Sequence, residues 1–163
     1  MWPVRIVKIA LVAGASLLFL LVGVNNLIDY QTNFDAVKHI LTMDKIPPGP
    51  FAGRAIVASA LHHALYLGII GLELAGGLAT MIGVLRLWRV RNDSAKAFNR
   101  EKSLAVCGLA AGLGLYFVGF ATIGGEWYQM WRAGDYNMQE PAFRFIGSIG
   151  LIMIFLNQSD EEI

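Results

Sequence analysis

Residues 65–85 read LYLGIIGLELAGGLATMIGVL, an apolar run in which Glu73 is the single charged residue. A helix needs about 20 apolar residues to cross the hydrocarbon core of a bilayer, and this run is long enough to do so. The run therefore predicts a membrane-spanning helix that carries one carboxyl group at membrane depth.

Three more apolar runs complete a pattern of four predicted spans, over residues 9–28, 62–86, 104–125 and 141–157. The composition agrees, because 56% of the residues are hydrophobic and only 15% are charged, whereas soluble domains carry about 25% charged residues. We therefore expect an all-α membrane protein, a single domain over residues 1–163 built as a four-transmembrane-helix bundle. The first run has no small-residue cleavage site after it, so we interpret it as a retained span and not as a signal peptide.

Basic residues predict the orientation of the bundle, because they are enriched in cytoplasmic loops. Eight of them flank the first span or lie between the second and third spans: Arg5, Lys8, Arg86, Arg89, Arg91, Lys96, Arg100 and Lys102. The other loops and their flanks hold five, spread over more residues. We expect both termini to be cytoplasmic (N-in/C-in), in a multi-pass protein of the inner (plasma) membrane.

The first outer loop contains apolar residues that fit one side of a short helix lying at the membrane interface. These residues are Phe34, Val37, Ile40, Leu41 and Met43. The sequence Pro47-Pro48-Gly49-Pro50 follows, and its prolines would end the helix, since each removes a backbone donor.

Several classes of function lack support in the sequence. The net charge of +1 argues against nucleic-acid binding, and the single Cys107 allows neither an intramolecular disulfide nor a cysteine metal site. No nucleophile elbow, phosphate loop or HExxH motif indicates an enzyme. The sequence does not support a haem site. The chain has three histidines, and two of them are adjacent, so that this pair cannot face one iron from a single helix. A zinc site of His62, His63 and Glu126 would lack any motif spacing, so we expect no metal or cofactor.

Small residues recur at four-residue spacing in the second and third spans. They are Gly71, Ala75, Ala79 and Gly83 in the second span, with Gly108 and Gly112 in the third. Small side chains let membrane helices approach closely. We expect these rows to pack within the chain, and contact with a partner subunit is the alternative.

Glu73 belongs to a polar stripe on the second span. Tyr66 and His62 lie seven and eleven positions before it, and these spacings place all three residues on the same side of a helix. With His63, Glu126 and Arg144 at the predicted outer level, they form a candidate ligand-binding set. An outward-facing pocket for a quinone or a lipid is one interpretation. The interpretation that we favour is a structural role, in which Glu73 forms a hydrogen bond with a neighbouring span.

Seven segments together resemble one known family. They are residues 25–34 (NNLIDYQTNF), 39–44 (HILTMD), 60–64 (ALHHA), 86–89 (RLWR), 97–102 (AFNREK), 118–127 (VGFATIGGEW) and 139–145 (QEPAFRF). Over essentially the whole chain the sequence resembles the bacterial predicted small integral membrane proteins, domain-of-unknown-function family 2165. The resemblance implies a bacterial inner-membrane protein with four spans, and it implies no activity.

Three functional hypotheses follow from these features. The leading one is a non-enzymatic accessory or scaffolding subunit of a larger, respiratory type of membrane complex, with the lipid bilayer and other membrane subunits, or further copies of the chain, as partners. The second is a quinone- or lipid-binding module built on the polar stripe. The third is a small proton-coupled transporter that uses Glu73.

Overall fold

The computed structural model describes residues 2–161, and these residues form helices joined by short connections. In chain order the elements are α1 (Trp2–Ile28), α2 (Tyr30–Thr42), the 3₁₀ turn η1 (Ala52–Arg54), α3 (Ser59–Arg89), α4 (Ala95–Gly114), the π-helical segment η2 (Leu115–Trp127), the 3₁₀ turns η3 (Met130–Arg132) and η4 (Gly134–Tyr136), and α5 (Gln139–Asn157). No β-strand occurs within this range.

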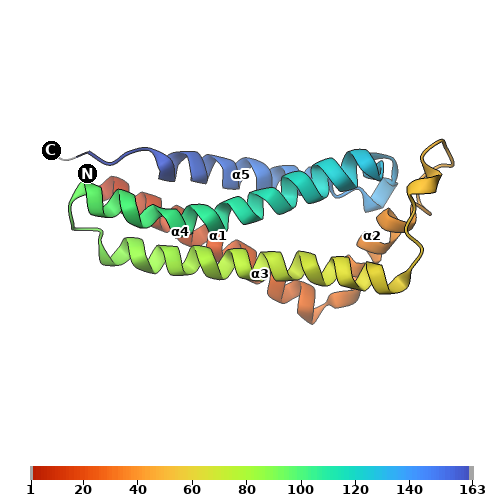
Figure 1. Ribbon diagram of the computed structural model, residues 1–163, viewed down its shortest axis with the longest axis horizontal. Helices are drawn as coiled ribbons and strands as arrows, with labels where there is room; N and C mark the ends of the chain where they lie inside the picture. The colour runs from red at the N-terminus through yellow and green to blue at the C-terminus, as the bar shows by residue number, and fades with distance from the viewer. Residues whose placement is uncertain (1, 162–163) are drawn as a thin grey trace.

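Four of the helical stretches are long and apolar enough to span a membrane, which confirms the predicted number of spans. They are Pro3–Ile28, Ser59–Arg89, Ala95–Trp127 and Gly134–Asn157. The third combines α4 and η2, which follow one another without a break. Both ends of the chain lie at one end of the bundle together with the α3–α4 connector, whereas α2 lies at the opposite end (Figure 1).

The helices extend past the apolar runs that predict them. The first begins at Trp2 and so includes Arg5 and Lys8, and the third begins at Ala95, well before the run at 104–125. The side chain of Ser94 caps that helix by accepting a hydrogen bond from the backbone N–H of Ala97 (3.3 Å). Hydropathy marks the part of a helix that suits lipid, while capping and tertiary contacts decide where the helix ends.

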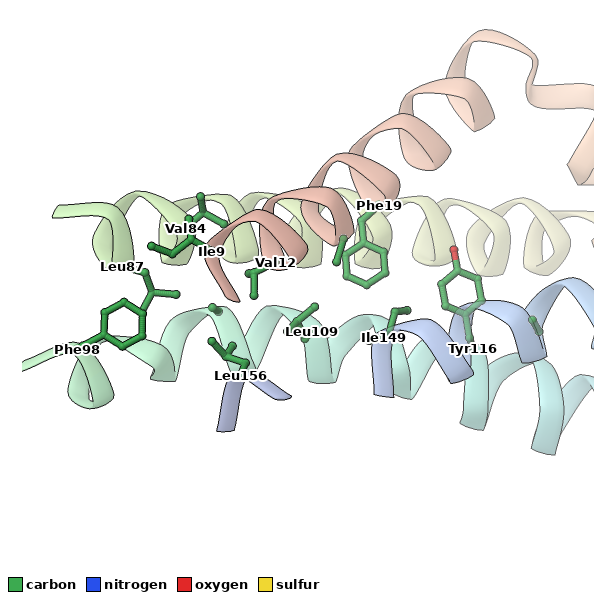
Figure 2. Close-up of a cluster of buried hydrophobic side chains, with 13 residues drawn as sticks. Ile9, Val12, Phe19, Val84, Leu87, Phe98, Leu109, Tyr116, Ile149 and Leu156 are labelled. Carbon is green, nitrogen blue, oxygen red and sulfur yellow. The ribbon is translucent and has the colours of Figure 1, made fainter. Parts of the chain in front are cut away.

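The largest hydrophobic core lies in the half of the bundle that holds the chain ends. It joins α1, α3, α4 and α5, and its fully buried members include Val12, Phe19, Leu87, Leu109 and Ile149. Figure 2 shows these side chains between the ribbons, with α1 rising away from α4 and α5 beyond Phe19. This half of the bundle is therefore the tightly packed one.

Glycines allow the close approach of α3 and α4. A Cβ atom at Gly108 would lie 2.3 Å from Thr80 Oγ1, and one at Gly83 would lie 2.6 Å from the backbone nitrogen of Ala105. At Gly112 a Cβ atom would collide with the Phe19 ring of α1, 2.0 Å from its Cζ atom. These three glycines of the predicted small-residue rows thus lie in helix contacts within the chain.

The other half of the predicted row on α3 requires a correction. Gly71 and Ala75 are exposed, and a Cβ atom at Gly71 would meet no described atom within 4 Å. Residues four apart advance about 40° around a helix at each step, so a long row winds off the contact face. The row that stays buried is Gly76, Thr80 and Gly83, whose spacings of four and three nearly cancel that drift. Ala79 lies between the two rows and is half-buried.

The short helix expected in the first loop is present as α2. Asp29 is the one residue between α1 and α2, and α2 buries Phe34, Ala36, Ile40 and Leu41. Met43 ends the helix in a left-handed conformation (φ 54°), before the prolines. Helix α2 then packs on η3 through Ile40, Leu41 and Met130. Its predicted place at a membrane interface stays a prediction.

Candidate ligand-binding site

A cavity of about 500 Å³ lies in the half of the bundle away from the chain ends. Residues of α1, α3, η2 and α5 in this half of the bundle form its walls, and α2 and the following connector cover part of it. Most of the lining is aliphatic or aromatic, including Val22, Val37, Ile40, Leu65, Ile69, Phe120, Ile123 and Phe145. Apolar cavities of this volume are typical of sites for small organic ligands.

One corner of the cavity is polar and is centred on Glu73, whose side chain is 2% exposed. Its Oε2 accepts a hydrogen bond from Asn26 Nδ2 on α1 (2.8 Å), and its Oε1 accepts one from Tyr116 Oη on η2 (3.3 Å). Asn33 Nδ2 on α2 donates in turn to Asn26 Oδ1 (2.7 Å). The network therefore ties four helices together at the polar corner.

Tyr66 belongs to the same corner. Its ring is 1% exposed, and its hydroxyl lies 3.5 Å from the backbone oxygen of Asn26, at the limit of a hydrogen bond. The ring packs edge-on against Tyr30 with the centroids 4.7 Å apart. Tyr66 therefore presents both an aromatic surface and a weakly engaged hydroxyl next to Glu73.

The wide backbone of η2 brings Tyr116 to this corner. Its hydrogen bonds join residues five apart, as between the Tyr128 N–H and the Ile123 oxygen (3.0 Å). The Tyr116 ring stacks on Phe145 of α5, with the centroids 4.4 Å apart, and Figure 2 shows its hydroxyl directed toward α3. π-Helical turns are rare in proteins and are frequent at functional sites.

Tyr128 lines the cavity just beyond the end of η2. Burial raises the pKa of its phenol above the ordinary value. The phenol therefore stays protonated at any physiological pH and can donate a hydrogen bond to a ligand.

Of the six residues in the predicted ligand-binding set, two line the cavity, namely Tyr66 and Glu73. His62 is buried beside them along α3, but its Nε2 forms a hydrogen bond with the backbone oxygen of Ile56 (2.8 Å). His63 is exposed, stacks on Phe34 with the centroids 4.2 Å apart, and forms a hydrogen bond with Tyr30 Oη (2.9 Å). The two histidines thus hold α2 and its connector in place.

The remaining two predicted residues lie outside the cavity lining. Arg144 is paired with Glu140 one turn before it on α5, and both are largely exposed. Glu126 is exposed on η2. The cationic side chain near that level is Arg54, which donates to the backbone oxygen of Trp127 (2.9 Å). Residues that share a depth in the membrane can still point to different sides of a bundle.

Sequence reasoning missed three members of the polar corner: Asn26, Asn33 and Tyr116. The usable signal was an amide in the last turn of an otherwise apolar span, because polar groups at that depth need partners. Tyr116 gave no such signal, since a tyrosine in an apolar span fits lipid contact as well as a buried hydrogen bond.

No cluster of three or more histidine, cysteine, aspartate or glutamate side chains that could hold a metal ion occurs in residues 2–161.

A second polar cluster lies at the opposite end of the bundle and holds the C-terminal segment. Asp160 Oδ2 accepts hydrogen bonds from Lys102 Nζ (2.7 Å) and Lys8 Nζ (2.9 Å), and Arg5 Nε lies 3.6 Å from its Oδ1. All four side chains are more than nine-tenths buried. Asn99 adds a hydrogen bond from its Nδ2 to the backbone oxygen of Asp160 (3.0 Å). Arg5, Lys8 and Lys102, which are among the basic residues that predict the orientation of the bundle, thus also hold the C-terminal segment in place.

The four apolar helices, the internal polar network and the apolar cavity define a class, that of small integral membrane proteins with an all-helical bundle. The chain belongs to the family described as predicted small integral membrane protein, domain-of-unknown-function family 2165, which matches residues 4–159. No curated protein and no solved structure matches the chain.

Proposed function

We propose that this protein binds one lipid-soluble small molecule, of the quinone or lipid class, in the cavity beside Glu73. The observation that carries the proposal is an apolar space of about 500 Å³ with a single hydrogen-bonding corner. Such a site suits a ligand with an apolar body and one polar end, because the walls remove the body from contact with lipid and water while the corner orients the end.

The arrangement of the lining supports binding more than a purely structural role for Glu73. A structural carboxyl group in a membrane bundle is expected in a well-packed contact, because unfilled space forfeits dispersion contacts. Glu73 has partners on two neighbouring helices and also borders open volume. Glu73 therefore meets its own hydrogen-bonding needs and remains accessible to a ligand.

The test is a substitution that fills the cavity. Gly119 lines it, and a Cβ atom there would be in ordinary contact with Leu115 Cδ1 (3.5 Å), so Gly119→Leu should fold and occupy ligand space. Gly114→Leu is the matched control on the same continuous helix, because a Cβ atom at Gly114 meets no described atom within 4 Å and Gly114 is not among the lining residues. Both variants are purified from native membranes in mild detergent, and the retained lipid-soluble molecules are quantified by mass spectrometry.

We expect wild type and Gly114→Leu to retain the same compound at a fixed ratio to protein, and Gly119→Leu to retain about tenfold less, a loss of about 1.4 kcal/mol in affinity. Equal retention by Gly119→Leu, or recovery of bulk lipid alone by all three proteins, would contradict the proposal.

A role as an accessory subunit of a larger membrane complex is the second candidate. It is supported by the exposed small residues Gly68, Gly71 and Ala75 on α3, next to which a partner helix could pack closely. Gly71→Leu would then abolish co-purification of a membrane partner without changing the stability of the isolated chain. Proton-coupled transport remains the third hypothesis, and a Glu73→Gln variant with unchanged transport phenotypes would exclude it.

We propose further that the end of the bundle with both termini faces the cytoplasm of a bacterial inner membrane, because that end gathers most of the basic residues. Single cysteines placed in a Cys107→Ser background test this. Val57→Cys, at a position that is 83% exposed, should react with a membrane-impermeant maleimide added outside the cell membrane, and Asp93→Cys in the α3–α4 connector should react only after permeabilisation. The reverse pattern would overturn the orientation.

A further inference from the structure

The cavity has one acidic side chain and no basic one. Among the described residues that line it, Glu73 is the only Asp, Glu, Lys, Arg or His. Its two hydrogen-bond partners, Asn26 and Tyr116, are neutral, and it takes part in no salt bridge within residues 2–161. A carboxylate in an apolar region is costly unless a counter-charge or a proton neutralises it.

Among residues 2–161 the other deeply buried acid is Asp160, and its surroundings differ. Asp160 has the charges of Lys8, Lys102 and Arg5 within 3.6 Å. Three cationic side chains therefore lie next to Asp160, whereas Glu73 has no cationic partner among residues 2–161. Unlike Asp160, Glu73 borders a space large enough to admit a molecule that brings its own charge.

The walls next to Glu73 favour a cation over other polar groups. Rings of Tyr66, Tyr116, Phe120, Tyr128 and Phe145 line the cavity. The face of an aromatic ring attracts a cation within about 6 Å, and the attraction is stronger when the cation is desolvated. Aromatic rings around a single carboxylate are the arrangement that recognises an ammonium group on an apolar body.

We propose that the ligand of this cavity is a lipophilic organic monocation, a quaternary or protonated amine, with Glu73 as its counter-charge and the rings of Tyr66 and Tyr116 beside it. The inference rests on the proposed function, because it names the class of molecule that the same cavity takes. It also states the form of Glu73 in the complex, which is the ionised carboxylate.

The competing state is a Glu73 that carries a proton and needs no counter-charge. In that state the cavity would prefer a neutral ligand, and a positive charge on the ligand would weaken binding, because the cation would then be desolvated without compensation. The two states therefore predict opposite orders of affinity for a cation and for its uncharged isostere.

The experiment compares benzyltrimethylammonium with neopentylbenzene, which has the same shape with carbon in place of the charged nitrogen. Binding to the full chain in uncharged detergent micelles is measured by equilibrium dialysis, with protein-free micelles subtracted. We expect saturable binding of the cation, one molecule per chain, about tenfold or more tighter than that of the isostere, because only the cation is attracted by the carboxylate and by the faces of the aromatic rings.

Glu73→Gln keeps the size of the side chain and removes its charge, and we expect it to reduce cation binding about tenfold while leaving the isostere unaffected. Glu140→Gln is the control, because Glu140 is exposed and is not among the lining residues. The comparison of the two probes on wild type needs no variant, so the inference remains testable if Glu73→Gln does not fold.

Three outcomes would overturn the inference, and they differ in what else they overturn. Equal or tighter binding of neopentylbenzene, or cation binding unchanged in Glu73→Gln, would refute the cation and leave the proposed cavity ligand in place. Saturable binding of neither probe, together with equal ligand retention by Gly119→Leu and wild type, would refute the cavity ligand as well.

Discussion

The side chain of Asp160 fixes an irregular segment against two helices, α1 and α4. It lies after the end of α5 and contacts Lys8 of α1 and Lys102 of α4, and its backbone is held by Asn99. Removing one partner of a buried ion pair is strongly destabilising, because the remaining charges stay buried without compensation. The C-terminal segment is therefore part of the folded bundle.

Asp160→Asn should lower the free energy of unfolding by about 3 kcal/mol, since it leaves two ammonium groups and a guanidinium without their counter-charge. The measurement is a dodecyl sulfate unfolding titration in mild detergent. Glu161→Gln is the control, because Glu161 is exposed and its change should stay within about 0.5 kcal/mol. Equal stability of Asp160→Asn and wild type would show that the cluster contributes little.

The same cluster predicts a dependence on pH. Burial alone would raise the pKa of Asp160, but the hydrogen bonds and charges of Lys102 and Lys8 outweigh burial and hold the pKa below 3.8. The stabilisation is therefore fully present above pH 3.8 and is lost as the pH falls through the lower pKa of the folded state. A nitroxide label at Ser159→Cys in a Cys107→Ser background should stay immobile at pH 5 and become mobile only in strong acid. Mobility that rises already near neutral pH would contradict this account.

At the residue scale, two of the residues that the sequence indicates, Glu73 and Tyr66, line the cavity. An acid at membrane depth is conspicuous, and helical spacing places Tyr66 beside it. The partners Asn26, Asn33 and Tyr116 come from three other helices. Their contact depends on how each helix is rotated about its axis, which hydropathy along one chain does not determine. The same reason explains why Glu126 and Arg144 were grouped with residues that they do not contact.

At the scale of the elements, the contact between α3 and α4 depends on glycine where the two backbones meet. A Cβ atom at Gly108 would lie 2.6 Å from Thr80 N and 2.7 Å from the backbone oxygen of Gly76, so the two helices would have to move apart. Of the predicted row on α3, Gly83 lies in this contact, whereas Gly71 and Ala75 are exposed.

Gly108→Ala should therefore destabilise the bundle by about 1–3 kcal/mol, the usual range for overpacking. Gly68→Ala is the matched control, because a Cβ atom at Gly68 meets no described atom within 4 Å and alanine favours a helix over glycine by up to about 1 kcal/mol. The unfolding titration in detergent measures both. A Gly108→Ala variant as stable as Gly68→Ala would mean that α3 and α4 do not pack in this way.

Segment η2 is the element that the sequence indicated least. Apolar periodicity predicts a helix over residues 104–125, and nothing in the residue pattern distinguishes five-residue from four-residue hydrogen bonding. Segment η2 nevertheless supplies Tyr116, which donates to Glu73, and Gly119 and Gly124, which line the cavity.

At the scale of the whole molecule, the four spans were predictable because the bilayer fixes the length and composition of a spanning helix. The cavity was not, because it results from the way in which the bundle is assembled. Phe19, Gly112 and Ile149 pack closely in one half, whereas α1 rises away from α4 and α5 in the other (Figure 2). Helix α2, which folds back from the end of α1, then covers part of the space that remains.

The decisive measurement is an experimental density map of the full chain, extracted from native membrane in mild detergent. We expect continuous non-protein density inside the cavity between α2 and α5, with one end next to the Glu73 carboxylate and the body along Ile69 and Phe120. A map in which these side chains repack to close the space, or in which the cavity holds separate water molecules only, would contradict it.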